Sequence, residues 1–131
     1  MKIALVLNDS FSMYHFRGAL IRTLLRLGCA VTVVVPPGDH IEKLRYMGCK
    51  VVMIPMSRFI NPVADVRMFF KMYHFFRSEV FDIVHNMTIK PNIFGSIAAR
   101  MAGIKRVVCL ISGIGFIFTE TNRVPARIFR F

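Results

Sequence analysis

The chain has 131 residues, 55% of them hydrophobic, and its 18 Lys and Arg against 7 Asp and Glu give a formal net charge of +11. This length suits one domain with a core of its own, and no apolar run approaches the roughly 20 residues that cross a bilayer. The basic residues are dispersed and form no nucleic-acid motif, so we expect an anionic lipid surface or a diphosphate-bearing substrate as the partner, and no nucleic acid.

Cysteine usage and the N-terminus indicate a cytoplasmic protein. The apolar start of the chain ends at Asn8 and Asp9 without a small-residue cleavage site, which argues against a signal peptide. Cys29, Cys49 and Cys109 are widely spaced and show no metal-ligand spacing. We therefore expect buried free thiols in a reducing compartment, and no metal site.

Strands and helices alternate along the chain. Apolar, β-branched runs predict strands near residues 2–8, 30–35, 50–55, 81–85 and 106–111. Helices are expected over residues 16–27, 39–47 with Asp39 as the cap, 62–79 with Pro62 in the first turn, and 93–101. Gly28, Gly48 and Gly103 each end a helix just before a strand. The pattern predicts an α/β fold with a Rossmann-like parallel sheet and helices on both faces.

The predicted helix over residues 62–79 is apolar around most of its circumference. Arg67, Lys71, His74 and Ser78 form one polar stripe among Phe, Tyr, Val and Met side chains. A helix that packs one face on a sheet needs an apolar arc of only about 100° or a little more. The remainder is typical of a helix that lies on an anionic membrane. Packing against another domain or a second copy is the alternative.

Polar residues gather after the first predicted strand, where ligands bind in open parallel sheets. The candidate substrate-binding residues there are Asn8, Ser12, His15 and Arg17. Arg17, near a helix N-terminus, can hold a phosphate or stay solvated. His15 can be a base, a hydrogen-bond donor or a packed loop residue. The loop matches neither GxGxxG nor a Walker motif, so NAD and P-loop functions lose their main support.

A second group follows the fourth and fifth predicted strands. Thr88, Lys90 and Asn92 precede or begin a helix whose exposed amides favour anions, and His85 is a candidate at the strand's end, with a structural role as the alternative. The loop Ser112-Gly113-Ile114-Gly115 offers backbone amides to a ligand. Its candidate binding residues are Ser112, Gly113 and Gly115.

These motifs together resemble one family. The motifs in chain order are Phe16-Arg17, Leu27-Gly28, Pro36-Pro37-Gly38, Asp82-Ile83-Val84-His85, Lys90-Pro91-Asn92-Ile93-Phe94-Gly95-Ser96 and Ser112-Gly113-Ile114-Gly115. They are similar to the N-terminal domain of family-four-type GT-B glycosyltransferases, in the bacterial subgroup that builds lipid-linked surface oligosaccharides. The resemblance covers essentially the whole chain.

The resemblance implies that residues 1–131 are the acceptor-side half of a two-domain retaining transferase. It implies a nucleotide sugar as substrate, no cofactor, and a lipid-linked glycan as acceptor, on the inner face of the plasma membrane. The donor-binding domain would follow residue 131, and this chain alone would be inactive.

Two departures from the family pattern leave the catalytic residues unknown. The first loop lacks the family's glycine pair, and Met87 replaces the second His of a His-x-His motif, so only His85 remains as a catalytic candidate. Half of a GT-B-like sugar-nucleotide epimerase is one alternative. A non-catalytic membrane-recruiting subunit with a separate donor-binding partner is another.

Overall fold

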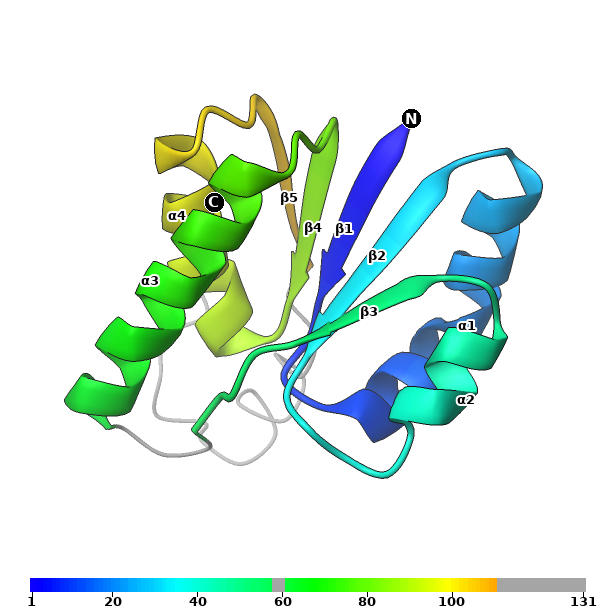
Figure 1. Cartoon of the computed structure of the whole chain (residues 1–131), viewed down its shortest axis with the longest axis horizontal. Coiled ribbons are helices and arrows are strands. Elements are labelled where there is room, and N and C mark those ends of the chain that lie inside the picture. The colour runs from blue at the N-terminus through cyan, green and yellow to red at the C-terminus, as the bar shows by residue number, and fades with distance from the viewer. Residues whose placement is uncertain (58–60, 111–131) are drawn as a thin grey trace, which may run out of the picture.

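The computed structural model describes residues 1–57 and 61–110, which form a five-stranded sheet in the order β3-β2-β1-β4-β5 (Figure 1). The strands are β1 (Lys2–Val6), β2 (Ala30–Val35), β3 (Lys50–Met53), β4 (Ile83–Met87) and β5 (Arg106–Leu110). All neighbouring strands pair in parallel. The predicted parallel α/β sheet is thus confirmed.

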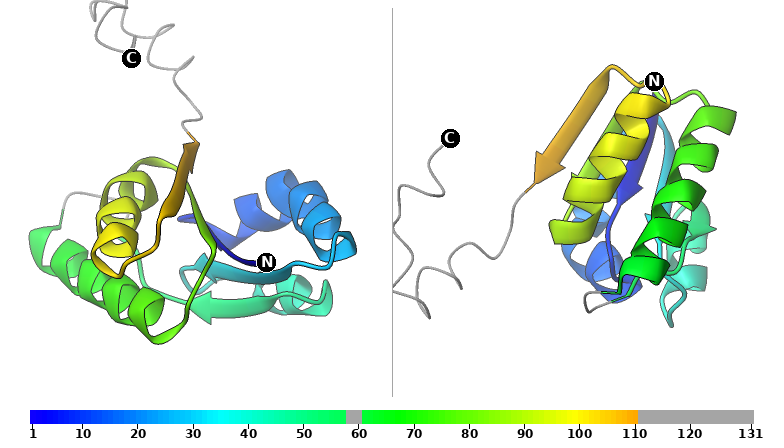
Figure 2. Two further views of the ribbon diagram at one scale, coloured as in Figure 1. Left: turned by 90° about the horizontal axis from the view of Figure 1, so that it is seen from above. Right: turned by 90° about the vertical axis from the view of Figure 1, so that its left-hand side faces the viewer.

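Helices cover both faces of this sheet. They are α1 (Ser10–Arg26), α2 (Ile41–Tyr46), α3 (Pro62–Ser78) and α4 (Ser96–Met101), the last preceded by a π-helical turn, η1 (Pro91–Gly95). In Figure 2 the sheet runs between the α1–α2 pair and the α3–α4 pair. Within the described ranges, none of the helices has the length and apolar character that crossing a bilayer requires.

Alternating side chains of the central strand supply the two cores. Ile3 and Leu5 of β1 pack in the cluster under α1 and α2, whereas Ala4 and Val6 pack under α3 and α4. All four are buried. This two-sided burial is what a continuous apolar run predicts for a central parallel strand.

The helix–glycine–strand junctions are confirmed by backbone geometry. Gly28, Gly48 and Gly103 have φ angles of 84°, 104° and 90°. These left-handed conformations cost glycine little and let each helix end immediately before its strand.

Several element boundaries differ from the prediction by a few residues, and three of the differences affect candidate residues or caps. Helix α1 begins at Ser10 rather than near Phe16. The Asp9 carboxylate caps it by accepting hydrogen bonds from the Phe11 N–H at 3.2 Å and from the Ser12 hydroxyl at 2.9 Å. The sequence prediction took these polar residues for a loop. The N-cap of α2 is His40, not Asp39, and its side chain makes no capping hydrogen bond. Strand β4 runs on to Met87, so His85 lies inside the strand and not past its end.

The expectation of three buried thiols holds only for Cys49. Cys29 is half-buried, and Cys109 is exposed because β5 lies at the edge of the described sheet.

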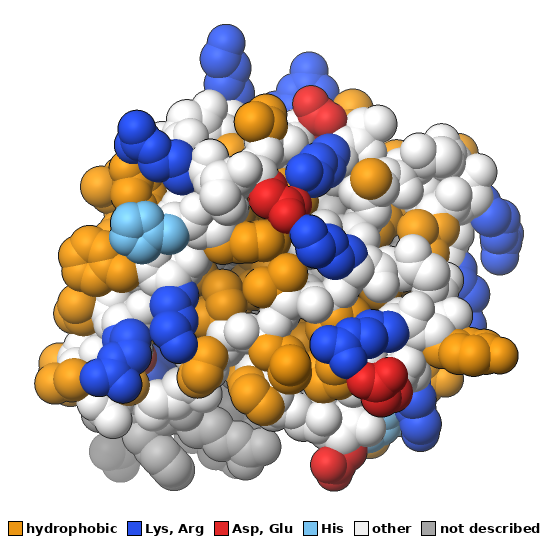
Figure 3. Space-filling model, viewed as in Figure 1, with side chains coloured by type: hydrophobic (Ala, Val, Ile, Leu, Met, Phe, Trp, Pro, Cys, Tyr) orange, Lys and Arg blue, Asp and Glu red, His pale blue; other side chains and the backbone are white. Residues whose placement is uncertain are grey.

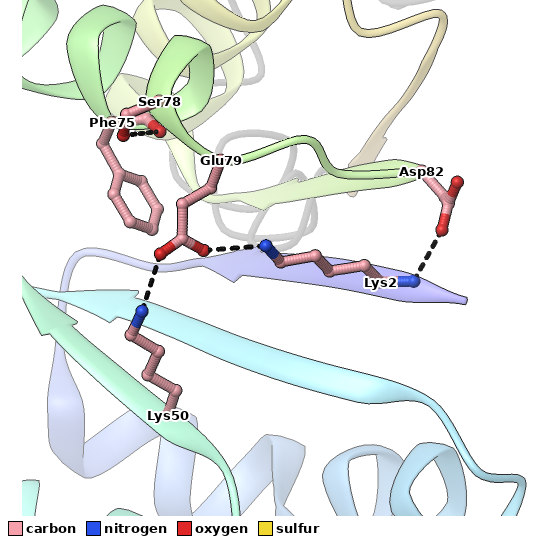
Figure 4. A network of polar contacts seen from close by, with 6 residues as sticks. All are labelled: Lys2, Lys50, Phe75, Ser78, Glu79 and Asp82. Carbon is pink, nitrogen blue, oxygen red and sulfur yellow. Dashed lines mark hydrogen bonds and ion pairs between the residues drawn. The ribbon is translucent and has the colours of Figure 1, made fainter.

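A charged network ties helix α3 to the amino edge of the sheet (Figure 4). The Glu79 carboxylate, at the C-cap of α3, accepts from Lys50 Nζ at 2.6 Å and contacts Lys2 Nζ at 3.1 Å. Lys50 begins β3 and Lys2 begins β1, so the network spans β2. The hydrogen bonds from Lys50 and then Lys2 hold the pKa of Glu79 below its ordinary value of 4.5.

We expect Glu79→Gln to lower the free energy of unfolding at pH 7 by about 1 kcal/mol or less, because the carboxylate is partly exposed and screened. A lowered folded-state pKa means that this stabilisation is present above pH 4.5 and is lost as the pH falls through the folded pKa. Urea unfolding from pH 7 to 3 should therefore show a smaller acid-induced loss in the variant than in the wild type.

The matched control is Glu42→Gln, which removes an exposed i,i+3 pair with Arg45. Its effect on stability should be smaller. Equal pH profiles for wild type and Glu79→Gln would show that the network does not contribute to folding.

Candidate functional site

A cavity of about 530 Å³ lies at the carboxyl edge of the sheet, beside the ends of β1 and β4. Its lining residues are Leu7, Ser12, Phe16, Arg17 and Thr88. The chain passes from β1 to β2 on one side and later returns to β4 on the other, so this is the point at which the strand order reverses. Open α/β sheets bind ligands at such switch points. The structure therefore brings the predicted residues Ser12, Arg17 and Thr88 together.

Two buried polar atoms of this cavity lack a hydrogen-bond partner in the described part of the chain. They are Nε of Arg17, from α1, and Oγ1 of Thr88, in the turn after β4. Leaving such a group unsatisfied costs about 1–3 kcal/mol, and more when it is charged. A ligand oxygen is a suitable partner for each of these atoms, because a guanidinium N–H and a hydroxyl can both donate to it.

His85 lies beside this positive charge. Every second residue of a strand points to the same face of the sheet, so His85 shares a face with Ile83 and Met87. Ile83 and Met87 pack in the core under α1 and α2, and His85 therefore faces the side of the sheet that carries Arg17. Burial, and after it the charge of Arg17, lowers the pKa of His85 below its ordinary value of 6.5. The imidazole is therefore neutral near pH 7, so one ring nitrogen can donate a hydrogen bond and the other can accept one.

Lys90 and Asn92 hold the turn after β4 and do not line the cavity. Lys90 Nζ pairs with the Asp65 carboxylate of α3 at 2.7 Å, and both side chains are largely buried. Asn92 donates through Nδ2 to the Leu110 carbonyl at 2.9 Å. A ligand contact of either residue stays a prediction, and for Lys90 it would have to coexist with the Asp65 pair.

The other candidates lie elsewhere. Asn8 is exposed before α1, and the loop residues Ser112, Gly113 and Gly115 fall outside the described residues. His15 is exposed on α1 and belongs to a group of rings. Its ring centroid is 4.3 Å from that of Phe11 and 5.2 Å from that of His40.

Sequence reasoning missed this ring group. The helix was expected to start near Phe16, so the i,i+4 relation of Phe11 and His15 was not seen. A helix start at the Asp9-Ser10 capping signal would have revealed it. His40 comes from the start of α2, and no local pattern in the sequence reports that contact.

Comparisons with known proteins agree with this fold. A profile of the family described as glycosyl transferase 4-like matches residues 2–131. Over 132 residues the chain is 30% identical to the N,N'-diacetylbacillosaminyl-diphospho-undecaprenol alpha-1,3-N-acetylgalactosaminyltransferase of Campylobacter jejuni, covering 100% of this chain and 35% of that enzyme.

Two further similarities are more limited. The UDP-Gal:alpha-D-GlcNAc-diphosphoundecaprenol alpha-1,3-galactosyltransferase of Escherichia coli is 35% identical over 73 residues, which cover 56% of this chain and 18% of that enzyme. A glycosyltransferase structure from Rickettsia africae superposes with a TM-score of 0.65 at 17% identity, covering 82% of this chain and 28% of that one, and so shows a shared fold.

The chain spans about a third of the Campylobacter relative's length and less of the Escherichia one. Because the family profile covers nearly every residue, the chain belongs to the glycosyl transferase 4-like family.

Proposed function

We propose that this chain is the acceptor-side half of a retaining glycosyltransferase that moves a sugar from a nucleotide sugar to a lipid-linked glycan. The observation that carries the proposal is the pair of unsatisfied buried atoms, Arg17 Nε and Thr88 Oγ1, in the cavity at the switch point. A phosphoryl oxygen of a lipid diphosphate fits that pair in charge and hydrogen bonding. The names of both curated relatives refer to undecaprenol-linked diphosphates, which supports the assignment.

The cavity is suited to binding and not to the transfer step. None of its five lining residues carries a carboxylate that could act as a base or nucleophile. His85 lies on β4 and is not among the lining residues, so we give this neutral imidazole an assisting role in the transfer step and not the role of the main catalytic group. We therefore propose that the nucleotide sugar is shared with a second, donor-binding domain, as the relatives' greater length suggests.

The first test is ligand binding by Arg17→Met. Loss of a charged hydrogen bond costs about 1.5–3 kcal/mol, so the affinity for a short-chain prenyl-diphosphate-linked GlcNAc should fall about tenfold to a hundredfold. Isothermal titration calorimetry measures this directly. Arg22→Met, which removes an exposed arginine five residues further along α1, is the matched control and should bind as the wild type does.

A second measurement reports on the same site without activity. Since the charge of Arg17 helps to lower the pKa of His85, Arg17→Met should raise that pKa, and so should bound diphosphate in the wild type. NMR titration of the imidazole follows both. Preference for a free UDP-sugar over the prenyl-diphosphate sugar would favour the epimerase alternative and contradict an acceptor site.

Residues 1–131 alone should not transfer sugar. The charge that develops on the nucleotide diphosphate during transfer needs an electrostatic clamp, and we place that clamp in the donor-binding domain. Incubation of the purified chain with UDP-GalNAc or UDP-Gal and a prenyl-diphosphate-linked GlcNAc should yield no product by mass spectrometry. Any turnover above a no-protein control would place the chemistry within this chain.

We propose further that the exposed face of α3 rests on an anionic membrane. Val63, Val66 and Phe70 are exposed there beside Arg67 and Lys71, for which no ion pair is found in the described residues. Figure 3 shows basic and apolar side chains intermixed on the side of the molecule that α3 forms. Arg67 and Lys71 also line a hollow of about 330 Å³ with apolar residues, among them Met68. Each cation near such a surface contributes about 1 kcal/mol.

The test is flotation with anionic vesicles at low salt. The double variant Arg67→Glu with Lys71→Glu should leave the vesicles, because two attractive charges become repulsive. The control, Lys105→Glu with Arg106→Glu, makes the same change in net charge at exposed residues near the start of β5 and should still bind. No binding by the wild type, or equal release of both variants, would assign α3 to packing against another protein surface.

A further inference from the structure

Thr88 has a backbone conformation that its side chain disfavours. Its φ angle is 72°, and it is the only non-glycine residue with a positive φ in residues 1–57 and 61–110. A β-branched residue is strained in this left-handed region, whereas glycine adopts it freely. Such outliers persist only where the surrounding structure enforces them, and they gather at ligand sites.

The surroundings of Thr88 enforce this conformation from two sides. Its carbonyl accepts a hydrogen bond from the Asn92 N–H at 2.9 Å, and Asn92 is in turn tied to the Leu110 carbonyl of β5. On the other side the fully buried Asn86 donates through Nδ2 to Ser96 Oγ of α4 at 3.1 Å. The turn is thus fixed to both β5 and α4, and Thr88 is held between these anchors.

The backbone of Gly95 also packs tightly against Asn86. A Cβ added at Gly95 would lie 2.5 Å from Asn86 Oδ1, so no larger residue fits there without a shift. This close approach lies within the π-helical turn η1, and such turns are frequent at functional sites. The turn therefore has little room to relax into a conformation that would relieve Thr88.

Two unfavourable features coincide at Thr88. Besides its backbone strain, its buried hydroxyl has no partner among the described residues. A glycine would remove both. The residue also lines the same cavity as Arg17, whose Nε is likewise unsatisfied.

We propose that the strained turn holds Thr88 so that its hydroxyl and Arg17 Nε donate to one phosphoryl group of the ligand, which makes Thr88 a binding determinant that lowers the stability of the unliganded protein. The identity of that group as part of a lipid diphosphate rests on the proposed function. The phosphoryl contact itself does not, and inorganic diphosphate is the probe for it.

Three variants of residues 1–131 distinguish the effect of the backbone strain at Thr88 from the effect of its hydroxyl group. Thr88→Gly removes both, Thr88→Val removes the hydroxyl and keeps the β-branched strain, and Thr88→Ser keeps the hydroxyl. Both Thr88→Gly and Thr88→Val should bind inorganic diphosphate about tenfold more weakly than the wild type, and Thr88→Ser should bind within about threefold of it. Calorimetric titration in phosphate-free buffer gives the affinities, with Thr23→Val, an exposed hydroxyl on α1, as the unaffected control.

Thermal unfolding without ligand supplies the second readout. Thr88→Gly should raise the melting temperature by about 2–4 °C above that of the wild type. It should also melt at a higher temperature than Thr88→Val, because only glycine relieves the backbone strain. Wild-type affinity in both Thr88→Gly and Thr88→Val, no diphosphate binding by the wild type, or a lower melting temperature for Thr88→Gly than for the wild type would each overturn the proposal. A failure of the prenyl-diphosphate sugar to bind, with these results intact, would instead count against the proposed function alone.

Discussion

The parallel pairing of β1 with β4 is the contact on which the rest of this structure depends. Strand β1 is buried on both faces and pairs with β2 on one side and with β4 on the other, in a register that sets Val6 beside Asn86. Because the chain leaves β1 toward α1 and leaves β4 toward η1, two segments far apart in sequence diverge from one point of the sheet edge. The cavity between Arg17 and Thr88 follows from that divergence.

The polar groups named above are satisfied at the amino edge of the sheet and unsatisfied at the carboxyl edge. At the amino edge, the Glu79 carboxylate is paired with the ammonium groups of both Lys50 and Lys2. At the carboxyl edge, Arg17 Nε and Thr88 Oγ1 are buried without partners and the backbone of Thr88 is strained. A protein tolerates such costs where binding repays them, which is a physical reason to place the ligand at the second edge.

Under the proposed function, the described residues bind the acceptor, and the groups that complete the transfer belong to a second domain. The cavity presents a guanidinium, two hydroxyls and apolar side chains, and the nearby His85 is neutral near pH 7. This composition suits an anionic acceptor whose sugar is supplied from outside the cavity. The proposal agrees with the alignment of this chain to about a third of a longer relative. It is also consistent with our second proposal, in which the basic and apolar face of α3 rests on a membrane.

The sequence by itself determined the strands, the helix–glycine–strand junctions, the family and the edge at which the polar residues gather. These are local signals, since apolar periodicity and glycine placement report the conformation of neighbouring residues. It did not determine where α1 begins, because the cap at Asp9 lies in a polar stretch that also reads as a loop. Nor could it separate Arg17 and Thr88, which share the cavity, from Lys90, which pairs with Asp65 on α3. Those partnerships join residues far apart in the chain, and the strand order and helix packing of the tertiary structure decide them. The tertiary structure also decides the positive φ of Thr88, a conformation that threonine itself disfavours. Asn92 hydrogen-bonds to the Thr88 carbonyl and to β5, and these contacts help to impose it.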